Sequence, residues 1–374
     1  MKIKNQILSF IILALVAVTT FSCSTDNTDA IVPLKSIMDI AKSDSNFTAL
    51  VAAIQKTGLD SATSSPLSSA GSYTVFAPTN VAFAALPITQ LQTAASISAL
   101  DPVVDAGLIA TLKLILQNHI LGIGTKADDL IVNTATGITG YSKTFAYYKA
   151  TPTATSGANL SMFVNKVGSD VLVNGGASNG GAKVTTADIP ASNGFIHVID
   201  HVLSLPTIVS QVIANPDFSS LLSVVTSVSG GTYGNQAPVL GVLAGATAGA
   251  STALTVYAPV NTAFATALGA GGSLTGSFFA TPALTETNIA KVLKYHVQTN
   301  NFPASSATSY TSATATTDQI VTTLLTQKFT ILKGTVKVTE LPVITVPASN
   351  MKIVNIQASN GVIFAMDRVL QPVL

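Results

Sequence analysis

The stretch "SYTVFAPTNVAFAAL" at residues 72–86 runs from an apolar, strand-like segment through a proline into an apolar, helix-like segment. A near copy, "ALTVYAPVNTAFATAL", stands at residues 253–268. Proline disfavours the helical conformation in the residue before it, so Pro78 and Pro259 should end the strand in each copy. The stretch therefore predicts a strand-to-helix hinge that the chain uses twice.

An asparagine follows each proline by two positions. Asparagine can accept a hydrogen bond from the free N–H groups at a helix start, so Asn80 and Asn261 are the expected caps of the helices that follow. Thr79 of the first copy is replaced by Val260, which has no hydroxyl, in the second. Asparagine is therefore the shared capping candidate, and the threonine is expected to be dispensable.

The repetition extends beyond the hinge to four segments that keep their order in both halves of the chain. Equivalent residues stand 167 to 181 positions apart, and this drift indicates insertions in connecting loops. We therefore predict two tandem copies of one domain, at residues 34–205 and 206–374. The matching segments are "NFTALVAAI" (46–54) with "DFSSLLSVV" (217–225), "TVFAPTNVAF" (74–83) with "TVYAPVNTAF" (255–264), "LKLILQNHI" (112–120) with "IAKVLKYHV" (289–297), and "ASNGFIHVIDHVL" (191–203) with "ASNGVIFAMDRVL" (358–370).

Hydrophobic periodicity predicts an α+β fold. Alternating apolar and polar residues around glycine-containing turns predict β-hairpins in residues 162–174 and 329–340. The glycine-rich run "NGGASNGG" at 174–181 lacks the lysine of a phosphate-binding loop, so we expect a flexible loop there. Helical spacing of apolar residues is found in 34–41, 47–54, 108–120, 208–214, 218–225 and 289–297.

At these segments each half resembles the fasciclin (FAS1) domain. The family pattern is a TVFAPTN-like first motif, a central Tyr-His and an NGVIHVID-like second motif, and both halves follow it in order. The resemblance implies a wedge of β-strands with helices packed around it, in a secreted or surface-anchored adhesion protein. It also implies that the Tyr-His element takes part in partner recognition. This gives His119, Tyr295 and His296 as candidate partner-binding residues, although the first copy has Asn118 in place of the tyrosine.

The N-terminus has the pattern of a bacterial export signal. Lys2 and Lys4 precede an uncharged apolar run at 7–18, which is too short for a typical membrane span. The only cysteine, Cys23, follows at a position that resembles the lipidation site of a bacterial lipoprotein. We therefore predict a signal peptide at 1–22, a lipidated tether at 23–33, and a place in the outer membrane, at the cell surface or on its periplasmic face. A chance cysteine behind an ordinary secretory signal is the alternative.

Composition excludes several classes of protein. Without residues 1–22 the chain carries 16 basic and 17 acidic side chains, so it offers no basic field for nucleic acid. No cysteine other than Cys23 is present, so an intramolecular disulfide is impossible. Residues 218–285 hold no charge, but glycine, serine and threonine interrupt this stretch, and it contains the second hinge. We therefore expect it to belong to a domain that does not cross the membrane.

The titratable residues offer no catalytic or metal set. His197 is replaced by Phe364 in the second copy, so its position is expected to require a packed ring. Asp200 and Asp367 match between the copies and are expected to orient a neighbouring loop through hydrogen bonds. No spacing typical of a metal site, a nucleophile or a cofactor loop is present. The remaining structural motif is a turn at the start of the last strand of each copy, with Asn193, Gly194, Asn360 and Gly361.

These observations predict a non-enzymatic adhesion lipoprotein that binds a cell-surface or matrix protein or a polysaccharide. It needs no cofactor, and the membrane is reached through the N-terminal lipid only. One alternative is a hydrolase or an accessory protein of polysaccharide uptake, using His119 or His296 with Asp200 or Asp367. The other is a purely structural periplasmic lipoprotein.

Overall fold

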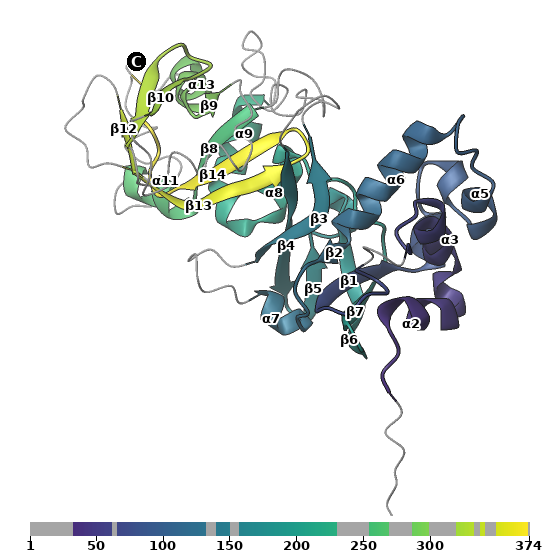
Figure 1. Cartoon of the computed structure of the whole chain (residues 1–374). Helices are drawn as coiled ribbons and strands as arrows, with labels where there is room; N and C mark the ends of the chain where they lie inside the picture. Colours follow the sequence, from purple (N-terminus) through teal and green to yellow (C-terminus); the bar gives the residue numbers. More distant parts are fainter. Residues whose placement is uncertain are drawn as a thin grey trace, which may run out of the picture. The chain divides into compact units, whose positions relative to one another are not determined.

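The structure of the chain is a computed structural model that describes residues 33–61, 66–131, 140–149, 157–229, 254–268, 286–298, 319–332, 337–340 and 349–372 (Figure 1). The predicted signal peptide, Cys23 and most of the tether lie outside the described residues. The same is true of much of the uncharged stretch. Among the described helices none is by itself long and apolar enough to span a membrane, and one pair, 208–214 with 216–226, meets those criteria only across a 102° bend.

Seven strands of the first half form a closed barrel in the order of the chain. β1 runs parallel to β7, and the other neighbouring strands are antiparallel. The expected wedge of strands is thus a closed sheet here. The strands are β1 (Tyr73–Pro78), β2 (Ile120–Leu121), β3 (Tyr141–Tyr148), β4 (Ala158–Val167), β5 (Asp170–Val173), β6 (Ala182–Ala191) and β7 (Gly194–Ile199).

The helices from α2 to α6 pack on one side of this barrel, whereas α7 contributes Leu130 to the cluster inside it (Figure 1). We call these elements together with β1–β7 the first repeat. Helices of fewer than three turns dominate, and α6 is the longest. The helices are α2 (Ile37–Ser43), α3 (Thr48–Lys56), α4 (Asn80–Ala84), α5 (Ala94–Ser98), α6 (Ala106–Asn118) and α7 (Ala127–Ile131), with the 3₁₀ turns η1 (Ser45–Phe47), η2 (Thr89–Leu91) and η3 (Ala177–Asn179).

The second repeat builds a seven-stranded sheet with the corresponding strand order, β10-β11-β12-β13-β14-β8-β9; unlike β2 and β3, β9 and β10 are not paired among the described residues, so this sheet is not closed there. β8 pairs in parallel with β14, as β1 does with β7. Its strands are β8 (Leu254–Pro259), β9 (Val297–Gln298), β10 (Gln319–Thr322), β11 (Lys328–Ile331), β12 (Lys337–Glu340), β13 (Ser349–Ala358) and β14 (Gly361–Met366). Its helices are α8 (Ile208–Ala214), η4 (Pro216–Phe218), α9 (Ser219–Ser229), α11 (Asn261–Leu268) and α13 (Glu286–Tyr295). The α+β fold predicted from periodicity is confirmed, while the domain boundary at residues 205 and 206 stays a prediction.

The two faces of the hinge strand contribute to two different cores. Val75 and Ala77 of β1 pack against the helices, whereas Phe76 points into the barrel interior. In β8, Val256 and Ala258 likewise face the helices, and Tyr257 faces the other cluster. Successive side chains of a strand point to opposite faces, so one short strand separates the two cores.

The hinge is confirmed, but its caps are not those predicted. Thr79 caps α4, because its hydroxyl accepts from the N–H of Ala82 at 3.3 Å. Asn80 is the first residue of α4, and its Oδ1 accepts from the N–H of Ala49 in α3 at 2.9 Å. Its Nδ2 donates to the carbonyl of Ser45 at 2.8 Å. Asn80 therefore uses its side chain to hold the start of α3, 31 residues earlier in the chain, and not the start of its own helix.

Asn261 repeats this arrangement in the second repeat. Its Oδ1 accepts from the N–H of Ser220 in α9 at 2.9 Å, and its Nδ2 donates to the carbonyl of Pro216 at 2.9 Å. The expectation that Asn80 and Asn261 cap the helices they precede is therefore wrong. Both join two helices of their own repeat.

The glycine-rich run is more ordered than predicted. Residues 177–179 form η3, flanked by Gly176 and Gly180 at positive φ. Asn179 Nδ2 donates to the carbonyls of Asn174 and Ser210, at 3.0 and 2.7 Å. The structure therefore shows a hydrogen-bonded turn in place of the expected flexible loop, because the side-chain amide of Asn179 holds the turn through two hydrogen bonds.

Candidate functional site

His119, which follows α6, joins two backbone segments through both of its ring nitrogens. Nδ1 lies 2.7 Å from the carbonyl of Ile115, and the N–H of Leu203 donates to Nε2 at 2.9 Å. A carbonyl can only accept and an N–H can only donate, so the ring is neutral and carries its proton on Nδ1. The imidazole therefore fastens the end of α6 to the segment that follows β7.

His296 makes the same pair of bonds in the second repeat. Nδ1 lies 2.7 Å from the carbonyl of Val292, and the N–H of Leu370 donates to Nε2 at 2.8 Å. His119 and His296 are only 2% and 3% exposed. Burial, opposed by the hydrogen bond to the carbonyl, lowers the pKa of each ring to about 4. We call these two arrangements the histidine clamps.

The tyrosine before the second clamp is also buried. Tyr295 is 0% exposed, its hydroxyl donates to the carbonyl of Lys328 at 2.8 Å, and its ring meets Phe329 edge-on. Its counterpart Asn118 is buried as well, and donates to the carbonyl of Ser204 at 3.2 Å. The expectation that Tyr295 and the two clamp histidines touch a partner directly is therefore corrected. They lie inside the fold, out of reach of a partner.

The matched aspartates tie the ends of two strands together. Asp200 Oδ1 accepts from the N–H of Lys183 at the start of β6, at 2.8 Å. Asp367 Oδ1 accepts from the N–H of Asn350 at the start of β13, at 2.7 Å. Both aspartates thus orient a neighbouring segment through hydrogen bonds, as predicted from their position in the repeats.

The turn before the last strand of each repeat anchors a helix. Asn193 Oδ1 accepts from the N–H of Ile37 at the start of α2, at 2.9 Å, and Asn360 Oδ1 does the same for Ile208 of α8, at 2.8 Å. The glycine that follows permits close approach of the neighbouring strand. A Cβ on Gly194 would clash with the carbonyl oxygen of Tyr73, and Gly361 is crowded in the same way by β8.

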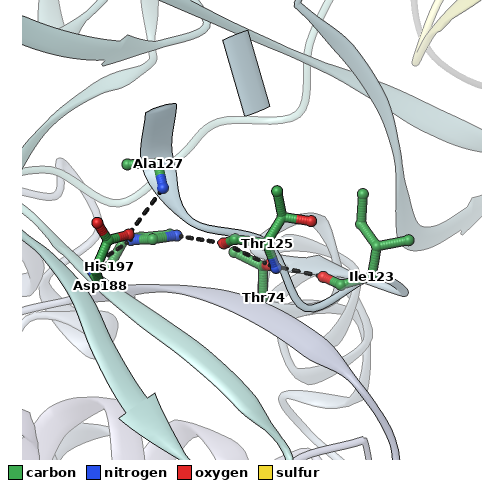
Figure 2. Close-up of polar contacts among 6 residues, drawn as sticks. All are labelled: Thr74, Ile123, Thr125, Ala127, Asp188 and His197. Atoms are coloured by element: carbon green, nitrogen blue, oxygen red, sulfur yellow. Dashed lines mark hydrogen bonds and ion pairs between the residues drawn. The ribbon is translucent and has the colours of Figure 1, made fainter. Parts of the chain in front are cut away.

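His197 of the first repeat lies at the centre of a polar network (Figure 2). Its Nε2 lies 3.1 Å from the carbonyl of Thr125, and its Nδ1 accepts from the N–H of Asp188 at 3.1 Å. The ring is therefore neutral with its proton on Nε2, the opposite tautomer to that of the clamps. Burial lowers its pKa, against the opposing effects of the Thr125 carbonyl and the Asp188 carboxylate.

The same network fixes the backbone of residues 122–126, which we call the β2–α7 loop. Thr74 Oγ1 donates to the carbonyl of Ile123 at 2.7 Å and accepts from the N–H of Thr125 at 2.9 Å, and Ser72 Oγ accepts from the N–H of Gly124 at 3.1 Å. The side chain of Ile123 is nevertheless 51% exposed. The loop therefore presents an apolar side chain on a backbone whose polar groups are bonded internally (Figure 2).

At the position of His197 the second repeat has aromatic packing. Phe364 stands where His197 does, paired with Tyr257 as His197 is paired with Phe76. The rings of Tyr257 and Phe364 stack at 5.5 Å, and Phe329 meets Tyr257 edge-on at 4.8 Å. The prediction that this position requires a packed ring is confirmed.

Sequence reasoning missed Asp188, although the repeats contain a signal for it. "DIPASNG" at 188–194 matches "NIQASNG" at 355–361, so Asp188 corresponds to Asn355. Both residues have positive φ, 61° and 64°, next to a register shift in their strand. Asp and Asn tolerate this conformation better than most residues. Aligning the copies over this stretch would have identified the bulge, though not the contact with His197.

The described residues contain no group of three His, Cys, Asp or Glu side chains that could hold a metal ion. Neither clamp histidine has a ring nitrogen left for chemistry, because backbone groups occupy both. What these residues do is position backbone segments.

Comparisons with known proteins point to one family. The model of the fasciclin domain matches residues 45–206 and 232–372. The chain is 30% identical over 207 residues to transforming growth factor-beta-induced protein ig-h3 of Sus scrofa, which covers 55% of this chain and 25% of that protein. It is 32% identical over 171 residues to protein sll1483 of Synechocystis, covering 46% of this chain and 74% of the relative.

Among solved structures, the chain is similar to a FAS1 domain pair from the insect cell adhesion molecule fasciclin I. The similarity covers 90% of this chain and 96% of that structure. The sequence identity is 16% and the TM-score 0.43.

Proposed function

Because this chain belongs to the fasciclin domain family, we propose that it is a non-enzymatic adhesion protein that binds a matrix or cell-surface partner. The family match, which spans both repeats, is the observation that carries this proposal. The chain spans about a quarter of the length of the pig relative, so the activity of that larger protein is here a proposal only. A fold alone does not fix function, so the surface that binds must be argued separately.

The β2–α7 loop is the surface we propose for the first repeat. Thr74, Ser72 and His197 hold its backbone, and the loop exposes the side chains of Ile123 and Lys126. A loop held rigid before binding loses little conformational entropy when it binds. His119 contributes indirectly, since it fixes the end of α6, which leads through β2 into this loop.

The tethering of the protein is a further part of the proposal. We infer that Cys23 is diacylated after removal of residues 1–22, which would hold the protein stably on the outer membrane. A palmitate label on the wild-type protein, absent from Cys23→Ala, tests this. Protease shaving of intact cells then separates surface display, in which the protein is digested, from a periplasmic structural role, in which it is protected.

A binding array tests the adhesion proposal. The purified protein is presented to matrix proteins, polysaccharides and cell-surface preparations. We expect binding to at least one of them, and a loss of at least about tenfold in Ile123→Asp, since a charge replaces the exposed apolar contact. Val104→Asp, which changes an exposed valine on a different loop, is the matched control and should bind like wild type. Absence of binding to every preparation would contradict the proposal.

The hydrolase alternative has a specific requirement. His119 or His296 would need a free ring nitrogen to move a proton, and each ring nitrogen of both residues is bonded to backbone. A screen of glycoside and ester substrates with wild type and His296→Ala tests it, and activity that disappears in the variant would favour the enzyme.

A further inference from the structure

One carboxylate oxygen of Asp188 lies between two possible hydrogen-bond partners, the N–H of Ala127 and the ring of His197. Oδ1 of Asp188 accepts a hydrogen bond from the N–H of Ala127, the first residue of α7, at 2.8 Å. The same atom lies 3.7 Å from Nδ1 of His197. The carboxylate therefore holds the end of the β2–α7 loop while it stands close to a ring that can gain a proton (Figure 2).

In the neutral ring, Nδ1 is an acceptor and is occupied by the backbone N–H of Asp188. A proton added to the ring must go to Nδ1, since Nε2 already carries one toward the carbonyl of Thr125. The N–H of Asp188 then faces another N–H and loses its acceptor. The nearby carboxylate is the group that can accept from the new N–H, and an imidazolium attracts it as an ion pair.

We propose that proton uptake by His197 draws Asp188 Oδ1 from Ala127 to the ring and thereby loosens the β2–α7 loop. The proton comes from solvent, which the Asp188 side chain, 39% exposed, can reach. No covalent bond other than the new N–H changes. The proposal adds regulation to the surface named above, and its biological consequence rests on the proposed function.

The charges around the ring are few. Asp188 of β6 is the one charged group among the described residues that contacts it or shifts its pKa. The loop and α7 carry Lys126, Asp128 and Asp129, of which Asp128 pairs with Lys166 of β4 at 3.0 Å. β1 contributes Phe76, whose ring centre is 5.4 Å away, and carries no charge. Burial lowers the pKa of His197, so the change should occur below the usual range of histidine.

The second repeat lacks both parts of this device. Phe364 cannot be protonated, and Asn355, at the same bulge with the same positive φ, has no carboxylate. His197→Phe and Asp188→Asn therefore copy residues that the fold already accepts at these positions, which makes them suitable variants.

A spin label on the loop tests the proposal without any partner. In a Cys23→Ser background, the label is placed at Ile123→Cys and its mobility is followed from pH 7.5 to 4.5, with circular dichroism to confirm that the protein stays folded. We expect the label to become more mobile in a single-proton step. The step should vanish in His197→Phe, and in Asp188→Asn it should move to lower pH, because a carboxylate stabilises the imidazolium and an amide does not.

A label at Val104→Cys is the control and should show no step, since that loop has no contact with His197 among the described residues. A step that persists in His197→Phe, a step shared by the Val104 label, or no step at all would overturn the proposal. Because no partner is present, a clear step in a protein that binds nothing in the array would support the switch and refute the adhesion function. Binding to a preparation in the array without a pH-dependent step would support the adhesion function and refute the switch.

Discussion

The two repeats bond their backbones with the same side chains but fill their sheets with different ones. Asn80 and Asn261, Asn193 and Asn360, Asp200 and Asp367, and the two histidine clamps make equivalent hydrogen bonds to backbone groups in each repeat. In contrast, His197 corresponds to Phe364, Asn118 to Tyr295, and Asp188 to Asn355. The shared residues hold the scaffold, whereas the residues that differ lie in the sheet, at its bulge and beside the clamp histidines.

The largest expected effect is on stability at acidic pH, and it should involve both repeats. Each clamp histidine has a folded pKa of about 4 against an ordinary value of 6.5. The unfolded chain therefore takes up protons between pH 6.5 and 4 that the folded chain refuses, so stability falls as pH falls through that range. The pKa difference corresponds to about 3 kcal/mol for each ring. Urea denaturation at pH 7 and pH 4.5 measures it.

Single variants test whether the two clamp histidines are equivalent. His119→Gln and His296→Gln should each lower stability at pH 7 and flatten the dependence on pH, while His201→Ala, at a partly exposed position, should leave stability at pH 7 unchanged. If only one of the clamp variants had this effect, the two histidines would not be equivalent.

A somewhat smaller effect is expected at the buried turn asparagines. Asn193→Ala leaves the N–H of Ile37 and the carbonyls of Pro66, Leu67 and Ser69 without the Asn193 amide, and should cost about 2 to 3 kcal/mol. Asn360→Ala removes the acceptor for the N–H of Ile208 and should be similar. Chemical denaturation compares both with Ser192→Ala, an exposed neighbour in the same turn. If either asparagine variant lost less stability than Ser192→Ala, the anchoring role would be contradicted.

The smallest effects are expected at the hinge. Asn80→Ala and Asn261→Ala should each cost about 1 to 2 kcal/mol, because each removes the acceptor from the start of another helix. Thr79→Val, which copies the second repeat, should cost about 1 kcal/mol or less, since it removes one 3.3 Å bond. Thermal unfolding ranks the three variants. A larger effect for Thr79→Val than for Asn80→Ala would contradict this ranking.

The hinge also shows what sequence could and could not predict. Periodicity located the strand and the helix on either side of Pro78, because burial on alternate faces leaves a pattern in the residue order. It could not assign the bond of Asn80, because the acceptor and the N–H of Ala49 are 31 residues apart and come together only in the packed fold. Comparison of the two copies identified the clamp histidines as a matched pair, but it did not predict that they are buried.

The network around His197 was the least predictable part. Its partners Thr74, Thr125 and Asp188 come from three separate segments, and two of the bonds use backbone groups that carry no sequence signal. The substitution by Phe364 correctly indicated a packed ring. It concealed the polar role, since a packed histidine and a packed phenylalanine leave the same hydrophobic pattern.

Histidine tautomers test the central claim most directly. Long-range ¹H–¹⁵N spectra of the imidazole rings at pH 7, assigned with single histidine variants, distinguish a proton on Nδ1 from one on Nε2. We predict that His119 and His296 both carry it on Nδ1 and stay neutral well below pH 6, while His197 carries it on Nε2. Different tautomers for His119 and His296, or the Nδ1 tautomer for His197, would contradict the account of a shared scaffold and of the polar network around His197 in the first repeat.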